Sequence, residues 1–136
     1  MDGIQDAHVA VIEDNPDNLE LILSILQDII GIKHCSSWMS GAAFFREVSH
    51  TRAFDLILLD IQIPRENGFD LIRRIRQDAS LQSACVVAVT ANTAQSDVRR
   101  AHEAGFNGFI GKPIRMDRFV NQITRIMAGE TVWEPR

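Results

Sequence analysis

The sequence predicts one α/β domain, built on a parallel sheet with helices on both of its faces. Short apolar runs alternate along the chain with stretches whose apolar residues recur at helical spacing. The runs are hydrophobic at consecutive positions, as expected of strands that are covered on both faces. The length of 136 residues and the hydrophobic content of 46% suit a single stable core.

The first half of the chain predicts three strands and two helices. A strand at 9–12 is followed by an amphipathic helix that begins at Asn15-Pro16, a capping residue followed by proline. This helix ends at Gly31. The next elements are a strand at 32–36, a helix at 41–48 and a strand at 54–59.

The second half continues the alternation. It predicts a helix at 68–76, a strand at 85–89, a helix at 94–104, a short strand at 109–110 and a helix at 115–127. The domain covers residues 7–128. Residues 129–136 form a C-terminal tail whose order the pattern does not decide, and Trp133 there either packs back on the domain or serves a partner.

Polar side chains follow the predicted strands where the strands end. Glu13 and Asp14 follow the first strand, Asp60 the third, Thr90 the fourth and Lys112 the fifth. Ligand sites of open parallel sheets form outside the carboxyl ends of the strands. We therefore expect these five side chains to converge on one edge of the sheet.

Three carboxylates in one site need protonation or a cation. Two unit charges ~4 Å apart repel by about 4 kcal/mol at an effective dielectric constant near 20. Oxygen ligands without His or Cys favour Mg²⁺ (or Mn²⁺). Glu13 and Asp14 suit the metal, whereas Asp60 stands alone and is the better nucleophile, since carboxylates form aspartyl phosphates. Lys112 and Thr90 can contact phosphate oxygens.

Four stretches of the chain resemble the receiver domain of bacterial response regulators. They are Val-Ala-Val-Ile-Glu-Asp-Asn at 9–15, Leu-Leu-Asp-Ile-Gln-Ile-Pro at 58–64 with Asn-Gly at 67–68, Val-Thr-Ala at 89–91 and Phe-Ile-Gly-Lys-Pro at 109–113. The resemblance covers residues 7–128. It implies a flavodoxin-like (βα)₅ fold with a five-stranded parallel sheet of order 2-1-3-4-5.

The resemblance also implies the chemistry of the site. Asp60 would accept a phosphoryl group from a phosphohistidine on a sensor histidine kinase or a phosphotransfer protein. Mg²⁺ would be held directly by Asp14 and Asp60, by Glu13 through water, and by the backbone carbonyl of Gln62. Phosphoryl oxygens would be bound by Thr90 and Lys112, and the bond between Lys112 and Pro113 would be cis.

A conformational switch is implied as well. The Thr90 hydroxyl would move toward the phosphoryl group, and the aromatic ring of Phe109 would turn inward. The output face would be formed by the helix at 94–104, the strand at 109–110 and the helix at 115–127, and it would control a downstream protein. Gln62 and Asn92 would tune the lifetime of the phosphoryl group, and phosphorylation-dependent homodimerisation is left open.

Composition and charge limit the partners and the cellular compartment that we expect for the protein. The net charge of −4 argues against nucleic acid as a direct partner. No apolar run approaches ~18 residues, so we expect no membrane span. The acidic start of the chain is unlike a signal peptide, and the two cysteines read as buried thiols of a reducing compartment, which predicts a cytoplasmic protein.

The same residues bear on the alternative functions. A nucleotide- or flavin-binding loop would not carry the acidic Glu13-Asp14 pair, which repels phosphate. A hydrolase with an Asp nucleophile needs an acid two residues on, where Gln62 stands; we expect no enzyme beyond self-phosphorylation and slow self-dephosphorylation. A phosphorylation-independent interaction module typically lacks one of the site residues. A receiver module of a hybrid kinase or longer regulator stays open, although Met1 favours a stand-alone receiver.

Overall fold

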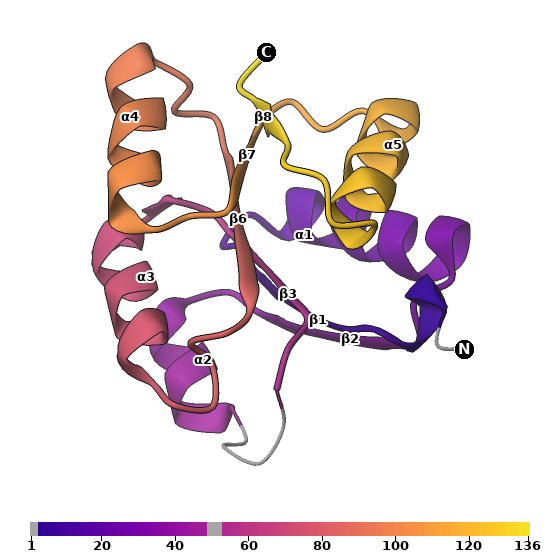
Figure 1. Ribbon diagram of the computed structural model, residues 1–136, viewed down its shortest axis with the longest axis horizontal. Coiled ribbons are helices and arrows are strands. Elements are labelled where there is room, and N and C mark those ends of the chain that lie inside the picture. Colours follow the sequence, from indigo (N-terminus) through magenta and orange to yellow (C-terminus); the bar gives the residue numbers. More distant parts are fainter. Residues whose placement is uncertain (1–2, 49–52) are drawn as a thin grey trace.

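A computed structural model describes residues 3–48 and 53–136, and its centre is a parallel sheet (Figure 1). The strands lie in the order β2-β1-β3-β6-β7-β8. Their bounds are β1 His8–Ile12, β2 His34–Trp38, β3 Leu56–Leu59, β6 Cys85–Thr90, β7 Gly108–Gly111 and β8 Trp133–Glu134. The first five strands of this order reproduce the predicted arrangement 2-1-3-4-5, and the α/β fold is therefore confirmed.

Helices cover both faces of the sheet. In Figure 1, α2, α3 and α4 lie on one side, and α1 and α5 lie on the other. The helix bounds are α1 Pro16–Ser24, α2 Gly41–Glu47, α3 Gly68–Gln77, α4 Gln95–Ala104 and α5 Met116–Met127. A 3₁₀ turn, η1 Ile4–Asp6, precedes β1, and a small hairpin, β4 Gln62–Ile63 with β5 Glu66–Asn67, precedes α3. Within the described residues, no helix is long and apolar enough to cross a membrane.

The strands are apolar at successive positions because each one contributes to two cores. In β1, Val9 and Val11 pack toward α1 and α5, whereas Ala10 and Ile12 pack toward α2 and α3. The same alternation holds in β3 and β6. Burial of apolar surface stabilises the folded state by roughly 25 cal/mol per Å². Strands that are buried on both faces therefore contribute most to stability and form the rigid support of the fold.

The predicted helix boundaries have the expected local causes. The Asn15 side chain accepts a hydrogen bond from the Asn18 N–H at 2.9 Å, and Pro16 is the first helical residue. The helix continues as a π-helical stretch, η2 Ile25–Ile30, and ends at Gly31, whose φ of 87° favours glycine. Only Ala101 of α4 is fully buried, in keeping with the thin apolar face predicted for that helix.

The structure differs from the predicted elements in several places. The third strand begins at Leu56 rather than at residue 54, and the hairpin of β4 and β5 was not predicted. The second strand begins at His34 rather than at residue 32, because Ile32 instead closes the preceding helix through a hydrogen bond to the Leu26 carbonyl. The sheet also has six strands rather than five. Residues 133–134, expected in a tail, form β8 beside β7, and the pairing rests on contacts with β7 and α5 rather than on any local pattern.

Candidate functional site

The three acidic residues step off the ends of two paired strands. Ile12 of β1 pairs with Leu59 of β3, so Glu13 and Asp60 leave the sheet side by side. The Asp60 N–H donates to the Ile12 carbonyl at 3.1 Å, which extends the pairing to the site itself. The site is thus carried by buried strands rather than by mobile loops.

The carboxylates of Glu13, Asp14 and Asp60 converge, as predicted. One oxygen of each lies within 4.8 Å of the others. Glu13 is 1% exposed and Asp60 4% exposed, whereas Asp14 is half-buried. Burial raises the pKa of Glu13, and the nearby Asp60 charge acts in the same direction. The cluster therefore concentrates negative charge where water screens it poorly.

Lys112 balances part of this charge. Its Nζ lies 2.7 Å from Glu13 Oε1 and 2.9 Å from Asp60 Oδ2. Burial disfavours the ammonium charge, but the two carboxylates outweigh it and raise the pKa of Lys112. Sequence reasoning assigned this lysine to phosphoryl oxygens only, and it missed the double ion pair.

The oxygen set suits a hard divalent cation. Backbone N–H groups hold two of the carboxylates: Asn15 donates to Glu13 Oε2 at 3.0 Å, and Gln62 donates to Asp60 Oδ1 at 2.9 Å. Glu13 Oε1 is buried, and its partner is the Lys112 ammonium, 2.7 Å away. Three converging carboxylates that one ammonium only partly neutralises fit Mg²⁺, which prefers oxygen ligands.

Thr90 joins the site through its backbone. The Lys112 N–H donates to the Thr90 carbonyl at 2.9 Å, and the Lys112–Pro113 bond is cis, as the resemblance implies. The fully buried Thr90 hydroxyl accepts a hydrogen bond from the Asn92 N–H at 3.1 Å. Within the described part of the chain, no hydrogen bond joins this hydroxyl to Asp60.

The remaining predicted site residues lie around this centre. The Gln62 side chain is exposed and that of Asn92 is half-buried. Phe109 is fully buried on the α4 side of the sheet, where its ring lies 6.2 Å from the ring of Trp133. The resemblance implies an inward turn of this ring on phosphorylation, but here the ring is already inside, covered by a residue that sequence reasoning left in the tail.

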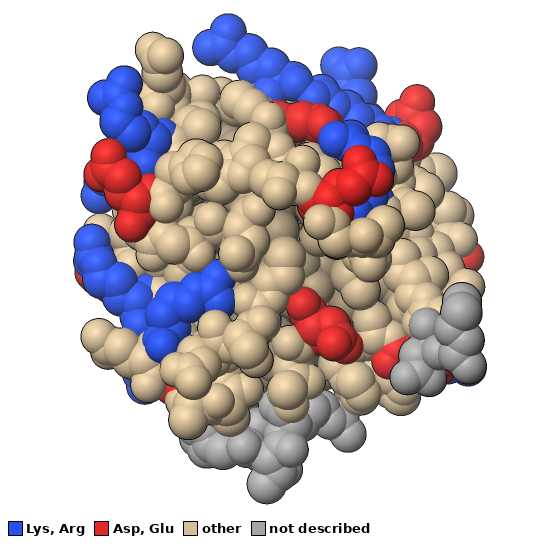
Figure 2. Space-filling view, in the orientation of Figure 1, with Lys and Arg blue, Asp and Glu red and all other residues tan. Residues whose placement is uncertain are grey.

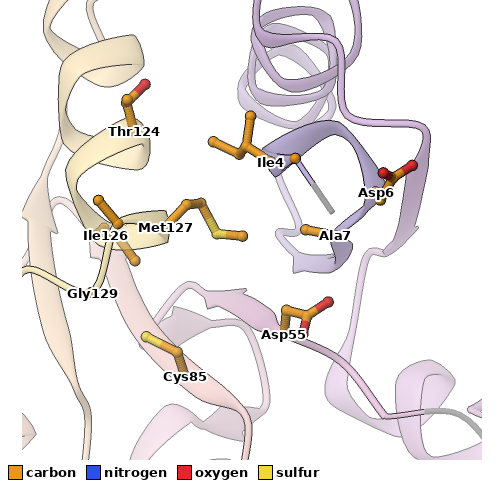
Figure 3. A pocket seen from close by; sticks show the side chains of 11 residues that line it. Ile4, Asp6, Ala7, Asp55, Cys85, Thr124, Ile126, Met127 and Gly129 are labelled. Atoms are coloured by element: carbon orange, nitrogen blue, oxygen red, sulfur yellow. The ribbon is translucent and has the colours of Figure 1, made fainter. Parts of the chain in front are cut away.

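A separate cavity of about 600 Å³ lies at the opposite edge of the sheet (Figure 3). Its lining includes Asp55 just before β3, Cys85 at the start of β6, and Met127 at the end of α5. The Asp55 carboxylate is already bound by the His8 N–H at 2.8 Å. This cavity is therefore at the amino ends of the strands and is distinct from the acidic site.

Comparison with known proteins identifies the family. The model of the response regulator receiver domain matches residues 9–124. The polar-differentiation response regulator DivK of Brucella ovis is 30% identical over 123 residues, which cover 85% of this chain and 91% of DivK.

A histidine kinase and a receiver domain from another histidine kinase are also similar to this chain. The signal transduction histidine-protein kinase BarA of Escherichia coli K12 is 32% identical over 125 residues, or 91% of this chain, but the chain spans only 13% of that kinase. A solved receiver domain of a Pseudomonas aeruginosa sensor histidine kinase has a TM-score of 0.76 and 25% identity, covering 92% of this chain and 99% of that one. The chain therefore belongs to the response regulator receiver domain family of two-component signalling.

Proposed function

We propose that the chain accepts a phosphoryl group on Asp60 in a Mg²⁺-dependent reaction. The observation that carries the proposal is the position of Asp60, a buried strand-end carboxylate between two further carboxylates and the Lys112 ammonium. A phosphohistidine of a sensor histidine kinase or phosphotransfer protein is the proposed donor. The similarity to a response regulator and to a histidine kinase supports this class of partner.

The two oxygens of Asp60 differ in how firmly they are held. Oδ1 is fixed by the Gln62 backbone N–H, whereas Oδ2 faces the long and rotatable side chain of Lys112. Oδ2 is therefore the proposed nucleophile. It forms the new O–P bond as the P–N bond of the donor breaks, the imidazole leaves with the bonding pair and takes up a proton, and the Lys112 ammonium follows a phosphoryl oxygen.

Glu13, Asp14 and Asp60 are the proposed side-chain ligands of Mg²⁺ (or Mn²⁺), together with the Gln62 backbone carbonyl. A divalent cation bound there would neutralise negative charge on the incoming phosphoryl group. The receiver domain from the Pseudomonas kinase was solved with a magnesium ion in its active-site cleft, which supports the same choice here. The Thr90 hydroxyl would give up its hydrogen bond from the Asn92 N–H and donate a hydrogen bond to a phosphoryl oxygen instead.

The output is proposed to be protein binding rather than catalysis. We expect only slow self-dephosphorylation, tuned by Gln62 and Asn92, because the exposed amide of Gln62 cannot shuttle a proton. The face formed by α4, β7 and α5 would control a downstream protein in the cytoplasm. The face seen in Figure 2 is mostly uncharged, with separate small groups of acidic and of basic side chains, which suits a protein partner better than nucleic acid.

Exposure to acetyl phosphate with and without Mg²⁺ tests the proposal. Intact-mass measurement should show the addition of one phosphoryl group, which depends on Mg²⁺ and is lost in Asp60→Asn. Asp17→Asn, which removes an exposed carboxylate from the first turn of α1, is the matched control and should be labelled like the wild type. Unchanged labelling of Asp60→Asn would overturn the assignment.

A further inference from the structure

The C-terminal segment, defined here as residues 131–136, lies along the edge of β7. Phe109 pairs with Trp133 and Ile110 with Glu134 in a parallel register, and the Phe109 N–H donates to the Val132 carbonyl at 2.8 Å. Figure 1 shows β8 next to β7, between α4 and α5. The segment therefore occupies the face through which we propose that the domain signals.

Apolar contacts anchor two successive residues of the segment on different helices. Val132 is 1% exposed and lies in the core that α5 contributes to, with Phe119 and Ile123. The Trp133 ring stacks on His102 of α4, with centroids 4.1 Å apart and an angle of 8° between the planes. The segment thus bridges α4 and α5 instead of resting on one of them.

Polar groups of α5 hold the next residue. One carboxylate oxygen of Glu134 accepts a hydrogen bond from Gln122 Nε2 at 3.0 Å, and the other accepts from Arg125 at 2.8 Å. The Arg118 guanidinium lies 3.9 Å from the same carboxylate. Because Gln122 is 3% exposed, this is a recessed polar site that recognises an acidic side chain.

Two glycines of β7 allow the close approach of the segment. A Cβ atom at Gly108 would lie 2.8 Å from the Val132 carbonyl oxygen, and one at Gly111 would overlap the Pro135 carbonyl. Neither position could carry a side chain without displacing the segment. The edge of β7 is thus a groove shaped for an extended strand of apolar, aromatic and acidic residues.

The same strand touches the acidic site. Lys112, which follows β7 directly, pairs with Glu13 and Asp60, and its N–H is bonded to Thr90. Gly111 is against Pro135, and the Phe109 ring is against Trp133. A phosphoryl group that drew the backbone of Lys112 or Thr90 toward it would shift β7, because Lys112 follows this strand directly and Thr90 pairs with Gly111.

We propose that residues 131–136 are an intramolecular ligand of the α4–β7–α5 groove, and that phosphorylation of Asp60 releases them so that a partner strand of similar chemistry can bind. That the segment occupies the groove is supported by the contacts described above. That phosphorylation releases the segment rests on the proposed function. The alternatives are a permanent sixth strand and exchange of the segment between two copies of the chain.

The first experiment measures binding of a fluorescent peptide with the sequence of residues 129–136 to the full chain. Val132→Asp puts a charge at the buried anchor and should empty the groove, and Thr131→Asp puts the same charge one position earlier, at an exposed residue. Apparent affinity is proportional to the fraction of molecules whose groove is empty, so Val132→Asp should bind the peptide at least ~10-fold more tightly than the wild type or Thr131→Asp.

Equal peptide binding by all three proteins would overturn the occupancy of the groove. Trp133→Ala, which removes a half-buried ring, provides a second variant if Val132→Asp does not fold, and it should also tighten peptide binding. Light scattering checks the assembly state. A wild-type dimer that becomes a monomer in Val132→Asp would show exchange between copies and would refute an intramolecular ligand.

The second experiment tests release. In a Trp38→Phe background Trp133 is the only tryptophan, and beryllofluoride with Mg²⁺ stands in for the phosphoryl group. We expect a red-shifted emission of Trp133 and ~10-fold tighter peptide binding. Fluorine NMR reports beryllofluoride binding separately. Bound beryllofluoride without a change at Trp133 would refute release alone, whereas no bound beryllofluoride would refute the proposed function and leave the peptide result standing.

Discussion

Replacement of Lys112 by methionine should destabilise the protein strongly in the absence of metal. The ammonium is 2.7 Å from Glu13 Oε1 and 2.9 Å from Asp60 Oδ2, with its side chain 12% exposed. Methionine keeps most of the apolar stem but leaves two buried carboxylates without their cation. The structure of the sheet is otherwise untouched by this change, so the measured loss reports the ion pairs.

The magnitude follows from two opposing terms. Each contact contributes about 6 kcal/mol of attraction at an effective dielectric constant near 20, and the desolvation of the charges offsets several kcal/mol of it. Removing one partner of a buried pair typically costs ~3–5 kcal/mol. Glu13 can take up a proton more easily than an ordinary glutamate, because burial raises its pKa, and a protonated Glu13 no longer needs a cation. We therefore expect Lys112→Met to lower the free energy of unfolding by about 3 kcal/mol, the lower end of that range.

Urea unfolding in EDTA and in saturating Mg²⁺ measures the effect. Lys33→Met is the matched control, since Lys33 pairs with Asp6 at 3.7 Å with both side chains largely exposed, and it should cost under ~1 kcal/mol. Mg²⁺ should stabilise Lys112→Met by at least ~1 kcal/mol more than the wild type, because the ion replaces the lost charge. Equal free energies of unfolding for the two variants in EDTA would refute the argument.

Three further predictions concern the support of the fold and the C-terminal segment. Asn15→Ala should lower the free energy of unfolding by about 1 kcal/mol, since it removes the side-chain cap of α1, and thermal unfolding measures this. Arg76→Met should lower the free energy of unfolding by ~2–3 kcal/mol, because the planar guanidinium donates hydrogen bonds to three backbone carbonyls and one side-chain amide oxygen at once. Arg76→Lys should restore little of this loss, and urea unfolding of the two variants measures both effects. Hydrogen bonds from Arg125 and Gln122 lower the pKa of Glu134, so the contribution of this carboxylate to docking of the segment should be complete above about pH 4.5 and should fade as the pH falls through the lowered pKa. The emission of Trp133 in the Trp38→Phe variant, recorded against pH, measures this loss. Glu134→Gln should remove the pH dependence.

The core of the fold could be predicted because its signals are local. Consecutive apolar residues mark strands that are covered on both faces, and Asn15-Pro16 and Gly31 mark the ends of a helix. Glu13 and Asp60 could be placed together for the same reason, since each directly follows such a strand. A polar residue at the end of a buried parallel strand has only one edge of the sheet to reach.

The sixth strand could not be predicted because nothing local specifies it. Two residues are too few to show alternation, and Pro135 follows them directly. The pairing depends on the closeness that Gly108 and Gly111 allow and on the arginines of α5, and all of these residues lie outside the segment that they hold. Similarly, Ile32 is apolar and buried as a strand residue would be, but its N–H closes a helix.

The charge of the acidic site explains why one lysine can serve two states. Three carboxylates and one ammonium leave the cluster with an excess of two negative charges, which a single divalent cation would remove. With such a cation present, the Lys112 ammonium is no longer the only counterion of Glu13 and Asp60 and can move to a phosphoryl oxygen without leaving a carboxylate unpaired. Metal binding and the movement of Lys112 are therefore coupled by charge balance. Because Lys112 directly follows β7, any part of that movement that involves its backbone would reach the strand against which the C-terminal segment is packed.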